Sequence, residues 1–206
     1  EFGWNPIYEK ENIIGLNKGV RNITLEPGNQ IELSGDKLNH IHEGCSESQD
    51  YLFELKQVTK KLDLKIVSAG FDPISKLEEV PNNPKQRYEL MTNDMPLDGE
   101  LSLDMMYRTC GTQLNIDYGS EKDFIKKFKV ANSIVPISIA LFANSSIVEK
   151  KNSNYLSYRS KVWQDTSRGG LPKLFFDDLN FEKYADFVMD FPTLFIQHKD
   201  QYISGR

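Results

Sequence analysis

Turn-forming residues divide the start of the chain into strands that pair with their neighbours in sequence. Asn17-Lys18-Gly19 separates the apolar-rich segments 13–16 and 21–25, and Asn and Gly accept the positive φ of a tight hairpin turn. Pro27-Gly28 then interrupts the chain before a further strand over residues 30–34. Strands joined by such short turns are antiparallel, so the chain begins as an antiparallel sheet and not as a strand-helix-strand unit.

The rest of the chain mixes helices and strands without regular alternation. The patterns predict helices over 38–62, 84–92, 120–142 and 181–189, strands over 64–69 and 109–118, a hairpin over 193–204, and polar loop over 144–172. Ser120 and Asn180 are the expected N-caps, and Pro136 should kink or break its helix. This order favours a single α+β domain over residues 1–206 with a mostly antiparallel sheet and flanking helices.

Composition excludes several classes of protein. The 25 basic and 30 acidic residues give a net charge of −5, which argues against a nucleic-acid-binding protein that relies on bulk charge. The longest nearly apolar run, 134–143, is too short to span a bilayer, so no membrane partner is expected. No secretory signal is visible, and two cysteines are typical of a reducing compartment, so we expect a cytoplasmic protein.

Acidic and polar residues share one face of the strand over 30–34. Glu32 lies there with Gln30 and Ser34, and Glu26 joins them if the Pro27-Gly28 turn preserves the alternation. Two neighbouring carboxylates repel each other unless a cation lies between them, and hard oxygen ligands suit Mg²⁺. The alternative is an ordinary solvated sheet face.

The strand expected over 109–118 has an uncharged polar row that includes Gln113 and Asn115 and ends at Asp117. Amides and small residues place hydrogen bonds in substrate pockets, although an exposed sheet face would look similar. A later segment, 154–163, combines aromatic residues with a central Arg159. A guanidinium grips carboxylates and phosphates through a bidentate fork, which suggests anion recognition. The alternative is a packed loop whose arginine pairs with a structural acid.

Read together, these segments resemble the plant-type glutamate–cysteine ligases, a family shared by plants and many proteobacteria. The matching segments follow the family's order over nearly the whole chain: 23–35, 84–88, 103–110, 113–118, 140–145 and 156–160, then Trp163 and Asp165-Thr166.

The resemblance implies a glutamine-synthetase-like carboxylate-amine ligase fold with the active site on the concave face of its sheet. It implies that ATP, as co-substrate, phosphorylates the γ-carboxylate of L-glutamate, and that the amine of L-cysteine then attacks the acyl phosphate. The products are γ-glutamylcysteine, ADP and phosphate, in the first step of glutathione biosynthesis. Mg²⁺ held by sheet carboxylates would bridge the phosphates.

The resemblance also assigns roles to residues. Glu26 and Glu32 become metal ligands, and Gln113 and Asn115 lie on the sheet floor near metal, nucleotide and substrate. Arg159 binds a carboxylate of glutamate and Trp163 shapes the wall. Met106 and Arg108 border the substrate cleft, and Arg108 joins Arg159 as a catalytic residue.

Two family segments have no counterpart here: an upstream Gly-x-Glu-x-Glu-Lys-Phe and a downstream Glu-x-Arg. We therefore expect an incomplete domain, the central part of a ligase. Gly111 also stands where the family usually has threonine. Two alternatives stay open, namely a related ligase that accepts another amine and a non-catalytic domain of the same fold.

Overall fold

The computed structural model describes residues 2–166, 172–191, 193, 195–198 and 201–204. The chain divides into two compact units. The N-terminal unit comprises Glu1–Ser68 and Val80–Tyr88, and the C-terminal unit comprises Ala69–Glu79 and Glu89–Arg206.

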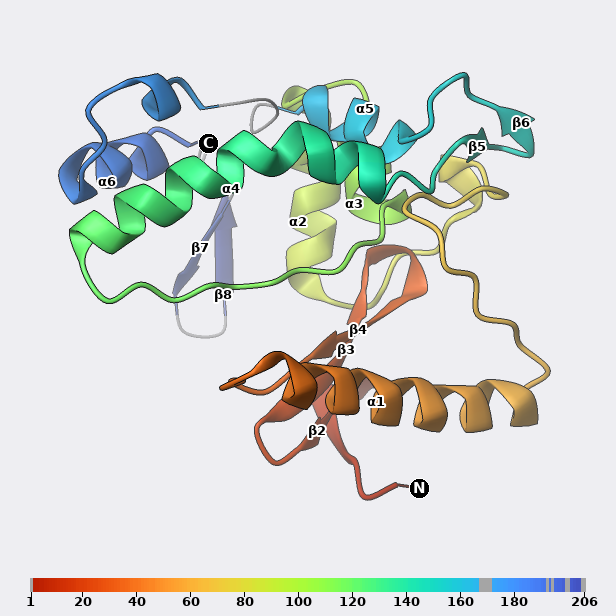
Figure 1. Cartoon of the computed structure of the whole chain (residues 1–206). Coiled ribbons are helices and arrows are strands. Elements are labelled where there is room, and N and C mark those ends of the chain that lie inside the picture. The colour runs from red at the N-terminus through yellow and green to blue at the C-terminus, as the bar shows by residue number, and fades with distance from the viewer. Residues whose placement is uncertain (1, 167–171, 192, 194, 199–200, 205–206) are drawn as a thin grey trace. The chain divides into compact units, whose positions relative to one another are not determined.

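The N-terminal unit contains an antiparallel sheet of four strands in the order β1-β2-β3-β4 (Figure 1). The strands are β1 (Asn5–Glu9), β2 (Asn12–Lys18), β3 (Arg21–Glu26) and β4 (Gln30–Ser34). The turn before β3 uses Gly19 at φ +66°, as the turn chemistry predicted. A short 3-10 turn, η1 (Pro27–Asn29), joins β3 to β4. The antiparallel start of the chain is confirmed, whereas β1 was not predicted.

The register of β3 against β4 determines which side chains share a face. Thr24 pairs with Glu32 and Glu26 pairs with Gln30. Directly opposed residues of an antiparallel pair project from the same face, and alternate residues of one strand do so too. Glu26 and Glu32 therefore share a sheet face, and the expected alternation does continue through the Pro27-Gly28 turn.

Helix α1 (Ile41–Lys61) follows the sheet in the N-terminal unit (Figure 1). Polar side chains of this helix contact the sheet and Trp4 before it. Its Glu54 accepts hydrogen bonds from Trp4 Nε1 at 2.6 Å and from Lys18 Nζ at 3.1 Å. Its Glu47 lies 3.9 Å from Arg21 Nε. The predicted helix is confirmed, but the strand expected over 64–69 is not formed. A strand needs a hydrogen-bonding partner, and within the described residues this segment has no ladder.

The C-terminal unit is mainly helical. Its helices are α2 (Gln86–Asp94), which begins in the N-terminal unit, α3 (Ser102–Arg108), α4 (Glu121–Leu141), α5 (Tyr158–Gln164) and α6 (Phe181–Met189). The unit also contains two hairpins, β5 (Ile147–Val148) with β6 (Lys151–Asn152) and β7 (Phe195–His198) with β8 (Gln201–Ser204). It has three 3-10 turns among its described residues: η2 (Leu77–Glu79), η3 (Met95–Leu97) and η4 (Lys173–Phe176). The molecule thus combines helices with antiparallel sheet, and the α+β class is confirmed.

Two apolar clusters stabilise the C-terminal unit. One joins α4, η4 and α6, where Phe124 packs with Leu174 and Leu179 and meets Tyr184 edge-on at 5.0 Å between ring centroids. The other lies between α3 and α5, where Val162 is fully buried. Phe71 is buried nearby and packs edge-on against Tyr158.

The predicted caps are confirmed. Ser120 accepts a hydrogen bond from the Asp123 amide at 3.2 Å, and Asn180 accepts one from the Lys183 amide at 2.8 Å. Pro136 does not end α4, which continues to Leu141. Proline removes one backbone donor, a small part of the hydrogen-bond ladder of a long helix. Among the described residues, no helix combines the length and apolar character that crossing a bilayer requires.

The strand expected over 109–118 is wrong for this structure. Thr109 forms an isolated antiparallel bridge with Phe71, and the residues after it form no ladder with any described strand. Leu114 and Ile116 are 72% and 64% exposed. The segment therefore has the apolar alternation of a strand without a neighbour to pair with. The loop expected over 144–172 also contains an unforeseen helix, α5.

Candidate active site

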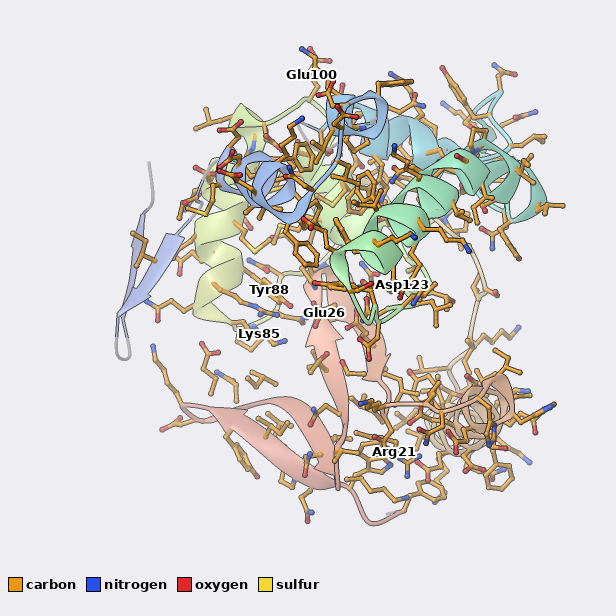
Figure 2. All side chains as sticks on the ribbon, turned by 60° about the vertical axis from the view of Figure 1, so that its left-hand side comes forward. Arg21, Glu26, Lys85, Tyr88, Glu100 and Asp123 are labelled. Carbon is orange, nitrogen blue, oxygen red and sulfur yellow. The ribbon has the colours of Figure 1, made fainter. Side chains whose placement is uncertain are left out.

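In the N-terminal unit, the end of β3 is surrounded by side chains from residues 83–88. The Tyr88 hydroxyl donates to Oε2 of Glu26 at 2.5 Å, and Lys85 Nζ lies 3.7 Å from Oε1 (Figure 2). Lys85 Nζ also donates to the Leu25 carbonyl, and the side-chain Nδ2 of Asn83 donates to the Glu26 carbonyl. These contacts fix the backbone and the carboxylate of Glu26, so we call Glu26, Asn83, Lys85 and Tyr88 the Glu26 cluster.

Burial governs the charges of this cluster. Lys85 is 5% and Tyr88 2% exposed. Burial lowers the pKa of Lys85, the charge of Glu26 opposes that shift, and the charge of Arg87 adds to it. Burial, followed by the hydrogen bond to Glu26, raises the pKa of Tyr88 to about 12. The tyrosine is therefore a hydrogen-bond donor at neutral pH.

Glu32 lies on the same face and is exposed. Its charge reaches Tyr51 of α1, where burial and then the Glu32 carboxylate raise the pKa of the phenol. Diagonal neighbours in an antiparallel pair lie about 7–8 Å apart, within reach of two glutamates that share one ion. Mg²⁺ commonly takes one or two carboxylates and completes its shell with water and phosphate oxygens.

These two residues therefore fit a Mg²⁺ site as donors. The described residues contain no cluster of three or more His, Cys, Asp or Glu side chains arranged to hold a metal. Glu26 would also share its carboxylate with Tyr88 and Lys85. The metal assignment of Glu26 and Glu32 stays a prediction.

In the C-terminal unit, α5 carries Arg159 and Trp163 one helical turn apart. Arg159 Cζ lies 5.5 Å from the centroid of the Trp163 ring, a cation–π distance. Burial lowers the pKa of the Arg159 guanidinium, which nonetheless stays charged at any physiological pH. Ser145 Oγ accepts a hydrogen bond from the Arg159 amide at 3.1 Å and so holds the start of the helix.

Two buried donors of this pair lack acceptors. Neither Arg159 Nε nor Trp163 Nε1 has a hydrogen-bond partner among the described residues, and no described acid forms an ion pair with Arg159. An unsatisfied buried donor costs about 1–3 kcal/mol, so a ligand acceptor at this position would be favourable. A carboxylate is the acceptor that most often pairs with a guanidinium.

Arg108 and Met106 are placed differently. Met106 is 7% exposed and Arg108 4%. Arg108 Nη1 donates to Asp104 at 2.9 Å and its guanidinium stacks on Phe71 at 4.5 Å. Arg108 Nη1 also lies 3.5 Å from Glu149 Oε1, so this arginine pairs with two acids. Its Nε and Nη2, like Arg159 Nε, are buried without a hydrogen-bond partner among the described residues. The roles of Met106 and Arg108 toward substrate stay predictions.

Gln113 and Asn115 project from the same side of the extended segment after Thr109. Gln113 Nε2 donates to Asn115 Oδ1 at 2.9 Å, and both residues are exposed. Their shared side agrees with the predicted alternation. Their roles toward nucleotide and substrate stay predictions.

Sequence reasoning missed the part that Lys85 and Tyr88 take in the Glu26 cluster. Residues 84–88 belong to the segments that resemble the ligase family. Their sequence does not indicate that Lys85 is buried, because lysine side chains are nearly always exposed.

Residues 6–203 match the family model of glutamate–cysteine ligase family 2. The chain belongs to this family. It is 44% identical over 205 residues to the chloroplastic glutamate–cysteine ligase of Nicotiana tabacum, which covers 98% of this chain and 39% of that protein.

Two further relatives are similar to the same extent. The chain is 43% identical, over 98% of its length, to the chloroplastic ligase A of Oryza sativa subsp. japonica and to the chloroplastic ligase of Arabidopsis thaliana. It spans 42% and 39% of their lengths. The chain therefore corresponds to about two fifths of these family members.

The names of these relatives contradict the cytoplasmic location expected from the sequence, because each relative is a chloroplast protein. That expectation rested on cysteine content and on the absence of a visible secretory signal. Neither property specifies an organelle, which explains the error.

Proposed function

We propose that the protein containing this chain is an ATP-dependent glutamate–cysteine ligase of the chloroplast, with the carboxylate-amine ligase fold of its family. Membership of glutamate–cysteine ligase family 2 and the names of three relatives support this proposal. The structural observation that carries it is the pair of buried, acceptor-less donors on Arg159 and Trp163. A carboxylate of glutamate is the acceptor that this pair would bind.

The reaction follows from the chemistry of its substrates. The γ-carboxylate oxygen of glutamate attacks the γ-phosphorus of ATP, so that an acyl phosphate forms and ADP leaves. The cysteine nitrogen then attacks the acyl carbon, the C–N bond forms, the C–O bond to phosphate breaks, and the amine loses a proton. Mg²⁺, when bound, would neutralise phosphate charge, and Glu26 and Glu32 would hold it.

Different residues of the chain would bind glutamate, nucleotide and metal. Arg159 and Trp163 would orient glutamate through its carboxylate, and Gln113 and Asn115 would offer amide hydrogen bonds to substrate and nucleotide. The Glu26 cluster would keep one metal ligand in a fixed rotamer, because Tyr88 and Lys85 contact separate oxygens of its carboxylate. Pre-organised ligands of this kind lower the cost of binding.

The test uses the full-length protein. ADP release is followed with glutamate and ATP, with cysteine or with serine or alanine in its place, and the product is identified by mass spectrometry. We expect γ-glutamylcysteine, and ADP release that depends on both glutamate and cysteine. Release with another amine alone would indicate a related ligase, and release with none would indicate a non-catalytic domain.

The same assay tests the role of Arg159. Arg159→Gln should raise the KM for glutamate by about a hundredfold, because a charge-assisted bidentate contact is lost. Lys161→Gln is the matched control, since residues two apart on a helix do not face the same side. An equal effect of both substitutions would remove Arg159 from the binding site.

A further inference from the structure

Arg87 lies in the first turn of α2, beside the Glu26 cluster. Its Nη2 donates to the Tyr88 hydroxyl at 2.9 Å, and its Cζ lies 4.8 Å from the centroid of the Tyr88 ring, a cation–π distance. The same Nη2 lies 3.9 Å from Oε2 of Glu26. The Tyr88 hydroxyl thus accepts a hydrogen bond from Arg87 and donates one to Glu26. Ring and hydroxyl together hold the guanidinium next to the carboxylate.

Arg87 differs from its neighbour Lys85 in exposure. The side chain of Lys85 is 5% exposed, and its ammonium donates to the Leu25 carbonyl in the interior. The side chain of Arg87 is 44% exposed. A guanidinium carries five N–H donors in a planar fork, so it can contact Tyr88 and a second acceptor at the same time. Arg87 is therefore an accessible base that is held in place beside Glu26.

The charge of Arg87 does not stabilise the helix that carries it. The N-terminus of a helix is the positive end of its dipole and favours acids, as where the Gln86 amide donates to Glu9 at 3.0 Å. Lys85 adds a second positive charge one residue before the helix begins. In the structure Glu9 and Glu26 compensate these two bases. If Glu26 shares its charge with Mg²⁺, this balance becomes positive and a further anion is favourable.

We propose that Arg87 is a further catalytic residue of the ligase, which binds the terminal phosphate of ATP beside Glu26. This inference rests on the proposed function, in which Mg²⁺ joins Glu26 to the phosphates. A guanidinium pairs with phosphate oxygens through its fork, and an arginine at a phosphoryl group in transfer stabilises the charge of the transition state. Tyr88 is then a positioning residue, because it fixes the guanidinium without touching the substrate.

The experiment compares Arg87→Gln with Lys56→Gln in the full-length protein. Lys56 is an exposed base of α1, so this variant controls for the loss of a positive charge from the same unit. Calorimetric titration with Mg²⁺ present measures the affinity for ADP and for adenylyl imidodiphosphate, an uncleaved analogue of ATP that keeps the third phosphate. We expect Arg87→Gln to bind the analogue about tenfold more weakly and ADP as wild type does. Lys56→Gln should bind both as wild type does.

Two further measurements separate the role of the fork from those of charge and structure. Arg87→Lys keeps the charge but not the planar fork, so it should recover only part of the analogue affinity. In Arg87→Gln kcat should fall by about a hundredfold, with the affinity for glutamate unchanged. The unfolding temperature shows that each variant is folded, and Arg87→Lys decides the question by the same titrations if Arg87→Gln is not.

Equal losses for ADP and the analogue, or no loss for either, would overturn the inference. A loss of glutamate affinity in place of analogue affinity would overturn it too, because the guanidinium would then serve a carboxylate. Wild-type protein that binds the analogue without forming γ-glutamylcysteine would refute the proposed function alone, and the comparison of the two nucleotides would still decide the role of Arg87.

Discussion

The Tyr88 hydroxyl donates a hydrogen bond to Glu26 Oε2 at 2.5 Å, linking a buried aromatic ring to a half-buried acid at the end of β3. Tyr88 is 2% exposed, while the Glu26 side chain keeps 23% of its surface. Lys85 and Arg87 approach the same carboxylate at 3.7 and 3.9 Å. The acid is therefore held by a neutral donor and two cations, and the neutral donor makes the shortest contact.

Tyr88→Phe should destabilise the full-length protein by about 2 kcal/mol, the usual value of a hydrogen bond to a charged group. The ring remains, so packing around it is preserved and the loss reports the hydroxyl alone. The measurement is the free energy of unfolding in urea. Tyr8→Phe, at a tyrosine of the same unit that is 58% exposed, is the control and should change it little. Equal values for the two variants would contradict the prediction.

The pH dependence of stability gives a second test of the same contact. Burial and the Glu26 contact raise the pKa of Tyr88 from 10.0 to about 12. Below pH 10 the folded and unfolded proteins both keep the phenolic proton, so the stabilisation is fully present. Above pH 10 the unfolded protein releases that proton first, and stability falls by about 1.4 kcal/mol per pH unit until the folded pKa is passed.

Tyr88→Phe should lack this part of the alkaline slope. Urea unfolding of both proteins at about pH 9 and about pH 11 measures the difference, since the remaining tyrosines titrate in both. The same loss of stability in wild type and variant would show that Tyr88 titrates as a solvent-exposed phenol does.

How far the sequence predicts the fold depends on how local the signal is. The turn at Gly19 and the caps at Ser120 and Asn180 are decided within a few residues, and all three occur as predicted. The segment over 109–118 has the alternation of a strand, but strand formation also needs a partner, which alternation does not provide. Helix α5 was missed because it is short and its N-cap, Ser157, makes no capping hydrogen bond.

In the candidate site, too, features with a local signal could be predicted and features that depend on distant residues could not. Alternation predicted that Glu26 shares the face of Glu32 if the Pro27-Gly28 turn preserves it, and the register shows that the turn does. Lys85 is buried where it donates to the Leu25 carbonyl, 60 positions earlier in the sequence, so no local pattern predicts its burial. The position of Gly111 beside the Arg159 guanidinium, where an added Cβ would lie 2.9 Å from Nη2, is equally remote in sequence and depends on where α5 packs.

Gly99→Ala should destabilise the protein by about 1–3 kcal/mol, the usual cost of overpacking. A Cβ at Gly99 would fall far inside contact distance of the Asp165 carbonyl oxygen, which is backbone and cannot turn aside. Asp165 also accepts a hydrogen bond from the Leu101 amide at 2.6 Å, which the shift would strain. Thermal unfolding measures the loss, and Gly119→Ala, in open space, should leave the unfolding temperature unchanged.

Glu32→Gln should abolish turnover and weaken Mg²⁺ binding by at least about tenfold, with no loss of stability, because the side chain is exposed and its shape is kept. Changing a residue that only supports a metal ligand costs about 10–100-fold in affinity, so losing a ligand should cost no less. Calorimetric titration of Mg²⁺ into full-length protein with ADP present measures the affinity independently of activity. Glu11→Gln removes an exposed charge from the β1–β2 turn and should leave Mg²⁺ affinity and turnover unchanged. If Glu32→Gln binds Mg²⁺ as tightly as Glu11→Gln does, Glu32 is a solvated acid, and the shared face with Glu26 has no metal function.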